Sequence, residues 1–221
     1  MKHQIKLPVY VPRFGLAAII LALLSGPAFA ADDKPAAAAA KPADPAAAPD
    51  MADMMKKMEE ISAPGPEHKL LSSLAGEWEA EVKSWMGGPD GEASVSKGTC
   101  KRTLVLGGRF LQEEFHGEMG GMKFNGMGLM GYDKFNKKYV NTWVDDMGTG
   151  IFISEGSADA TGKVVTHTGK MDEPFSGEKA KPVKMITRIL SPDKNVFEMH
   201  DLGLGEKSKV MEITYTRKKA Q

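Results

Sequence analysis

Residues 74–86 read LAGEWEAEVKSWM. Between positions 77 and 84, charged side chains alternate with apolar or small ones. This period of two predicts a β-strand with one face in solvent and the other in a core. Gly76 stands directly before the alternation, and Trp78 is its first large apolar residue. The strand is therefore predicted to begin by burying an indole ring.

The chain after Gly76 repeats this pattern of strand, turn and strand. Clusters of turn residues, such as GGPDG at 87–91 and SPDKN at 191–195, separate alternating apolar segments. We count about ten such segments at hairpin spacing, and none has a helical period. This arrangement is typical of an antiparallel sandwich or a closed barrel, and a closed barrel leaves no exposed sheet edge.

The two ends of this region carry a resemblance to the lipocalin-like (calycin) barrels. In that group a Gly-x-Trp opens the first strand, and an Arg or Lys of the last strand lies across the Trp. Here the resemblance implies that Trp78 closes the barrel floor and that Arg217 covers it.

Further stretches are similar to the bacterial exported family catalogued as domain of unknown function 1579. They are LAGEW (74–78), VLGGRFLQEEF (105–115), GLMGYD (128–133), NTWVD (141–145) and MEITYTR (211–217). The resemblance implies an all-β, about ten-stranded antiparallel lipocalin-like barrel over residues 76–218. It also implies a cavity for a small molecule, and it implies no catalytic residue.

The N-terminal 30 residues read as a cleavable export signal. A basic start containing Lys2, Lys6 and Arg13 precedes an apolar run at 14–24, and Ala-Phe-Ala at 28–30 fits a cleavage site. The run is too short to span a bilayer, so we expect no stable membrane span after cleavage. The predicted location is the periplasm or the exterior of a bacterial cell.

Residues 31–50 consist almost entirely of Ala, Pro, Lys and Asp, which predicts a disordered linker. Residues 51–75 then predict one or two short helices that lead into the barrel. Asp50 is a suitable N-cap, and Met54, Met55 and Met58 share one helical face with Met51. A methionine face could bind Cu(I), or it could pack on the barrel or across its mouth.

Charge and cysteine content exclude some classes of function. The chain has 29 basic and 29 acidic residues, and no basic stripe predicts nucleic-acid binding. Its single cysteine, Cys100, cannot form an internal disulfide and is predicted to be a buried apolar side chain.

The alternation of charged residues predicts which side chains face the interior. It turns His167 and Tyr215 inward, and it favours Asn141 and Trp143 over the alternative set Val140, Thr142 and Val144. The strand at 110–118 is ambiguous, because either Leu111 and Phe115 or a polar wall of three residues could face inward. With the polar wall included, the candidate cavity residues are Gln112, Glu114, His116, Asn141, Trp143, His167 and Tyr215.

The first functional hypothesis is that this cavity binds a small apolar or amphipathic molecule. No metalloprotease, phosphate-loop or nucleophile-elbow motif is present, so no catalytic, cofactor or metal site is predicted. Haem on His167 or His116 and Cu(I) on the methionines remain alternatives.

Two further hypotheses belong to other classes. Glu114, His116, Asp145 and His167 could form an enzyme site if their strands are neighbours. Alternatively, the helix with Met54, Met55 and Met58 could dock the domain on a protein partner in the cell envelope.

Overall fold

The computed structural model describes residues 50–85, 88, 90–174 and 176–219. The predicted signal peptide and nearly all of the predicted linker lie outside these residues. The described part holds two helices, one short 3-10 helix and ten strands. Among the described residues, neither helix is long and apolar enough to cross a membrane.

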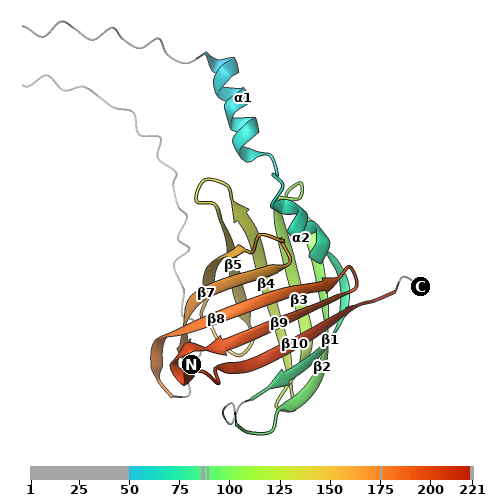
Figure 1. Ribbon diagram of the computed structural model, residues 1–221, viewed down its shortest axis with the longest axis vertical. Coiled ribbons are helices and arrows are strands. Elements are labelled where there is room, and N and C mark those ends of the chain that lie inside the picture. The colour runs from blue at the N-terminus through green and yellow to red at the C-terminus, as the bar shows by residue number, and fades with distance from the viewer. Residues whose placement is uncertain (1–49, 86–87, 89, 175, 220–221) are drawn as a thin grey trace, which may run out of the picture. The chain divides into compact units, whose positions relative to one another are not determined.

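The strands form one closed antiparallel barrel, which confirms the predicted fold class (Figure 1). The order around the barrel follows the chain from β1 to β10, and β10 closes against β1. The strands are β1 (Gly76–Ser84), β2 (Ser94–Val105), β3 (Phe110–Met119), β4 (Met122–Asp133), β5 (Lys138–Asp145), β6 (Phe152–Ala158), β7 (Val164–Glu173), β8 (Glu178–Ser191), β9 (Lys194–Asp201) and β10 (Lys209–Arg217).

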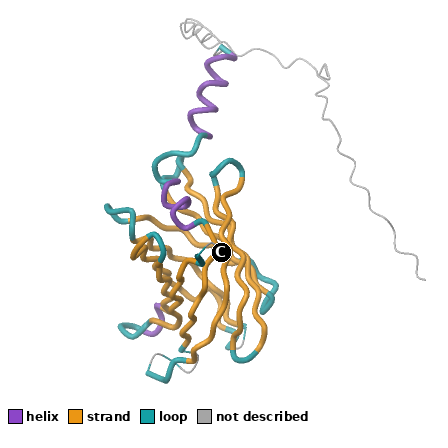
Figure 2. The backbone as a smooth tube through the Cα atoms, turned by 90° about the vertical axis from the view of Figure 1, so that its right-hand side faces the viewer, coloured by secondary structure: helices purple, strands orange, loops and turns teal. Residues whose placement is uncertain are grey.

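The two helices precede β1, as predicted. The second, α2 (His68–Leu74), packs against one end of the barrel (Figure 2), where Leu70, Leu71 and Leu74 join a core with Leu111 and Val165. We call this end the floor end; the odd-numbered strands begin there. The opposite end, where β1, β3, β5, β7 and β9 finish, is the rim.

The first helix, α1 (Met51–Ser62), begins at Asp50, whose side chain accepts a hydrogen bond from the Ala52 backbone. No residue of α1 is buried, and Met51, Met55 and Met58 each expose about two thirds of their surface. The alternative in which the methionine face packs on the barrel is therefore wrong. The end of α1 is held instead by Arg109 and Lys134, which donate to backbone carbonyls of residues 60–63.

The floor is sealed by Trp78, which is 1% exposed. Its Nε1 donates to the Leu74 carbonyl at 3.0 Å, and Cζ of Arg217 lies 4.1 Å from its ring centroid. The contact between Trp78 and Arg217 that the resemblance implied is thus present. Arg217 also donates to the carbonyls of Ala75 and Ser73, so its guanidinium ties α2 to the last strand.

Gly76 makes this arrangement possible for two reasons. Its φ of +130° is unfavourable for any residue with a side chain. A Cβ placed there would also lie 2.2 Å from Nη1 of Arg217. The glycine of the Gly-x-Trp sequence therefore leaves room for the guanidinium that covers the tryptophan.

Candidate functional site in the barrel interior

The structure resolves the ambiguous strand β3. Leu111 and Phe115 are buried in the interior, and Glu113 lies on the same face. Gln112, Glu114 and His116 therefore lie on the outer face, and the polar-wall alternative placed them on the wrong side. His116 lines a hollow of about 460 Å³ on the outside of the barrel, together with Lys97 and Lys123.

The other predicted cavity residues do face the interior. Asn141 and Trp143 share the inner face of β5 with the buried Tyr139, and His167 lies inward on β7 beside the buried Val165. Tyr215 is inward on β10 and is 2% exposed. Tyr215 packs close to the floor, whereas Asn141 and Trp143 are only partly buried.

An ion pair inside the barrel was missed in the sequence. Arg102 of β2 and Glu113 of β3 are register partners, and Nε of Arg102 lies 2.7 Å from Oε2 of Glu113. Cζ of Arg102 lies 4.2 Å from the centroid of the Tyr215 ring, and Nη1 of Arg102 donates to Oδ1 of Asn195 at 3.3 Å. A signal existed, because Arg102 stands two residues after the predicted buried Cys100 and therefore shares its face.

Burial and this ion pair together shift the pKa values of the groups at this position. Burial by itself would lower the pKa of Arg102, but the Glu113 carboxylate offsets that effect and the pKa is raised. Burial and then Glu113 raise the pKa of the Cys100 thiol well above its ordinary range. Cys100 therefore stays protonated and is not a nucleophile. Burial also raises the pKa of Tyr215 well above its ordinary value.

Aromatic rings form a large part of the inner wall. The Trp143 ring lies over Gly126 and Gly128 of β4, where added Cβ atoms would be 2.1 and 3.1 Å from its atoms. Phe152, the register partner of Trp143, lies in the same way over Gly169 of β7. Glycine in these strands thus provides space for flat rings.

Two buried polar side chains lie deeper on the wall than these rings. Ser154 follows Phe152 by two residues on β6 and is 1% exposed, and His167 of β7 is 6% exposed. Ser154 Oγ and His167 Nε2 have no hydrogen-bond partner among the described residues. Burial lowers the pKa of His167 to about 4, so its imidazole is neutral near pH 7.

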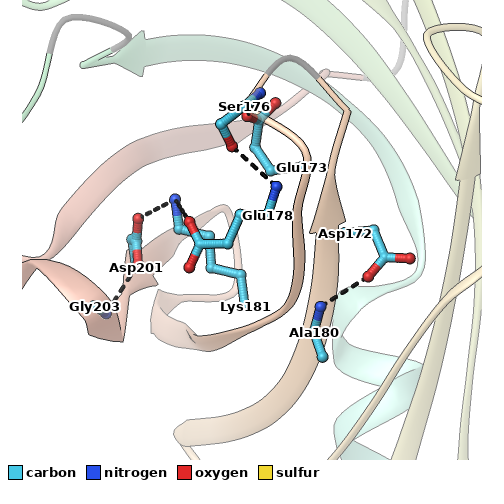
Figure 3. A network of polar contacts seen from close by, with 8 residues as sticks. All are labelled: Asp172, Glu173, Ser176, Glu178, Ala180, Lys181, Asp201 and Gly203. Atoms are coloured by element: carbon cyan, nitrogen blue, oxygen red, sulfur yellow. Dashed lines mark hydrogen bonds and ion pairs between the residues drawn. The ribbon is translucent and has the colours of Figure 1, made fainter.

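The rim carries a polar network that joins β7, β8 and β9 (Figure 3). Lys181 Nζ lies 2.7 Å from Asp201 and 3.5 Å from Glu178, and Asp201 also accepts from the Gly203 backbone. The hydrogen bond to Asp201 is the main reason why the pKa of Lys181 is raised. The lysine inside the rim is therefore already paired.

The proposed enzyme constellation does not assemble. Glu114 and His116 lie on the outer face of β3, whereas Asp145 and His167 lie on the inner faces of β5 and β7. Within the described residues, no group of three or more His, Cys, Asp or Glu side chains could hold a metal ion. Of the histidines on the barrel strands, His167 alone faces the interior, so a histidine ligand to haem from the barrel wall could come only from it.

A second hollow lies at the floor end, between α2 and the ends of the strands. It measures about 680 Å³ and is lined by α2, by the connection between β6 and β7, and by Tyr132, Tyr139 and Ile189. Burial, aided by Glu67, raises the pKa of Tyr139 to about 12, and the Tyr139 hydroxyl donates to the Glu67 carbonyl.

The closed antiparallel barrel, its Trp–Arg floor and its mixed aromatic and polar interior define a lipocalin-like barrel protein. Residues 63–217 match the family described as "Protein of unknown function (DUF1579)", and the chain belongs to that family. No curated protein is significantly similar to the sequence.

Solved structures match part of this chain. One is the crystal structure of Rv2717c from M. tuberculosis, with 16% identity and a TM-score of 0.51, over 71% of this chain and 100% of that chain. Another is the S-type phycobiliprotein lyase CPES from Guillardia theta, with 11% identity and a TM-score of 0.47, over 72% of this chain and 100% of that chain. At these identities the likeness concerns the fold alone.

Proposed function

We propose that this protein binds a small apolar or amphipathic molecule inside the barrel. One observation carries the proposal: many side chains that face the interior of the closed barrel, several of them apolar, remain partly exposed. Other parts of the interior are tightly packed: Trp78, Val165 and Tyr215 near the floor and Val183 toward the rim are at most 2% exposed. The partly exposed, inward-facing side chains include Glu113, Asn141, Trp143, Phe152, Met171, Phe197, Met199 and Met211.

In a closed barrel, an inward-facing side chain that is exposed indicates that solvent enters the interior. The strand wall separates these residues from outside solvent, so water must reach them through the interior. Glu113, whose partner Arg102 has a side chain only 6% exposed, keeps 22% of its own side chain accessible. An accessible interior with apolar rings and a few polar groups is the usual form of a small-molecule site.

Tryptophan fluorescence provides the test, because Trp143 lies on the inner wall and Trp78 lies at the floor. Fatty acids, isoprenoids and porphyrins should be screened by fluorescence titration and by thermal shift. Binding by at least one class should change the emission and raise the unfolding temperature by mass action. A flat response to all three classes in both assays would contradict the proposal.

We further propose that the protein acts in the periplasm or outside the cell, after removal of residues 1–30. The support is the basic, apolar and small-residue pattern of those residues. Mass spectrometry of the protein from its native cells should find Ala31 at the N-terminus, and recovery of an intact chain from the cytoplasm would contradict export.

A further inference from the structure

Three inward-facing polar atoms of the described residues are buried without a hydrogen-bond partner: Ser154 Oγ, His167 Nε2 and Asn195 Nδ2. A buried polar group left without a partner costs about 1–3 kcal/mol. Such a cost at two neighbouring positions is expected where a further molecule completes the hydrogen bonds.

The register brings the side chains of Ser154 and His167 together. Ser154 pairs with Gly169 on β7, and His167 is two residues before Gly169 on the same inner face. Ser154 and His167 are therefore diagonal neighbours, with Cα atoms about 7–8 Å apart. A single oxygen or nitrogen atom placed between them could contact both side chains.

The apolar surroundings lie on the rim side of this pair. Phe152 precedes Ser154 by two residues on β6, and Trp143 is its register partner on β5. A molecule with its polar end at Ser154 would therefore extend along both rings toward the rim. Asn141, the register partner of Ser154, adds a polar group beside the same position.

The charges of the interior limit the ligand further. The cationic side chains that face inward in the described segments are Arg102, Lys181 and Arg217, and each lies within 4 Å of a carboxylate. His167 contributes no positive charge near neutral pH. A ligand carboxylate at this depth would be buried without a counter-charge, which is strongly unfavourable.

Resting on the proposed function, we propose that Ser154 and His167 bind the hydroxyl or carbonyl group of an uncharged ligand whose apolar part packs against Trp143 and Phe152. Both side chains can pair with a hydrogen-bond donor or with an acceptor on the ligand. A serine hydroxyl donates or accepts, and a neutral imidazole nitrogen does one or the other according to its tautomer. The ligand class is thus a neutral alcohol, phenol, ketone or amide, and not a fatty-acid anion.

Entry to the pair requires a side chain to move, since Ser154 is 1% exposed. Met171 lies two residues beyond Gly169 on the inner face of β7 and is partly exposed on the rim side. A methionine adapts its unbranched side chain at low cost. Met171 is therefore the neighbour that can yield to an incoming ring.

The test compares naphthalene, 2-naphthol and 2-naphthoate, which share one ring system, by equilibrium dialysis at pH 7 with the whole protein. We expect 2-naphthol to bind about tenfold more tightly than either of the others, as a net gain of one or two hydrogen bonds predicts. Ser154→Ala should reduce 2-naphthol affinity about fivefold to tenfold and leave naphthalene unchanged. His167→Met should act in the same direction.

Ser157→Ala is the matched control, because Ser157 lies on the exposed outer face of the same strand. It should change neither affinity. Ser154→Ala should also keep or raise the unfolding temperature, because it removes a buried hydroxyl without a partner.

Each other outcome overturns a defined part of the account. Equal binding of naphthalene and 2-naphthol, tighter binding of 2-naphthoate, or no effect of Ser154→Ala overturns the assignment of Ser154 and His167 but leaves the binding function standing. Failure of all three probes, together with a flat screen, overturns the binding function itself. A clear fall in the unfolding temperature of Ser154→Ala would show that the hydroxyl already has a partner.

Discussion

The Trp78–Arg217 contact at the floor and the Ser154–His167 pair on the inner wall differ in how their polar groups are satisfied. At the floor, the Trp78 indole and the three nitrogens of the Arg217 guanidinium all donate to backbone carbonyls. On the wall, Ser154 and His167 are buried as deeply but leave polar atoms without partners in the described residues. The Trp78–Arg217 contact therefore stabilises the fold, whereas the unpartnered atoms of Ser154 and His167 cost stability, as does Asn195 Nδ2 near the floor.

The largest effect should follow from removing the centre of the floor. Trp78→Ala deletes a buried ring, its hydrogen bond and its stacked guanidinium, and should cost about 3–5 kcal/mol of unfolding free energy. This is a large share of a typical stability of about 5–15 kcal/mol. Trp85→Ala is the control, because Trp85 is only partly buried, on the outer face beside Lys209, and should cost about 1 kcal/mol. Urea unfolding measures both, and a greater loss for Trp85→Ala would reverse the assigned faces of β1.

The Arg102–Glu113 pair should show the cost of one unpaired charge in the interior. Arg102→Met leaves the Glu113 carboxylate without its partner and should cost about 3–5 kcal/mol. The double variant Arg102→Met/Glu113→Leu should recover most of that loss, because no buried charge remains. Both values come from urea unfolding at pH 7. A double variant as unstable as Arg102→Met would mean that packing, and not charge, dominates at this position.

The buried His167 on the inner wall should make the free energy of unfolding depend on pH. The pKa of His167 is about 4 in the folded protein and near 6.5 in an unfolded chain. Between those values the unfolded chain binds more protons, so stability falls as the pH decreases from 6.5 to 4. The full loss is about 2–4 kcal/mol. In His167→Phe this part of the pH dependence should disappear, as urea midpoints at several pH values would show; an unchanged slope would mean that carboxylates cause it.

The smallest of these effects should come from Arg217→Lys. Lysine keeps the positive charge but cannot reach three backbone carbonyls or stack its head group flat on the indole. We expect a loss of about 1–2 kcal/mol, well below that of Trp78→Ala. Thermal unfolding compares the two variants directly, and equal losses would indicate that the guanidinium, more than the ring, holds the floor.

The sequence was sufficient where charge alternates cleanly with apolar residues. In β1 and β10 that alternation identified the inner faces of Trp78 and Tyr215, and the family resemblance supplied the contact with Arg217. In β3 it failed for a physical reason: Glu113 is an acidic residue on the inner face, buried with Arg102. An internal ion pair makes both faces of a strand look polar, so period-two analysis had no basis for a choice.

Other features of the site could not be predicted from the sequence, because they depend on contacts between strands. The pairing of Ser154 with Gly169, which makes His167 its diagonal neighbour, is a matter of register between strands. The lack of hydrogen-bond partners at those two residues depends on every side chain around them. The local sequence around the glycines of β4 likewise does not show that Trp143, on the next strand, lies over them.

The most direct test of a ligand site in the interior is a crystal structure of the protein saturated with its tightest-binding compound from the fluorescence screen. The account predicts that compound inside the barrel, against Trp143 and Phe152, with an uncharged polar atom within hydrogen-bond distance of Ser154 Oγ or His167 Nε2. A compound bound instead in the hollow of about 680 Å³ beside α2, with the interior unchanged, would contradict it.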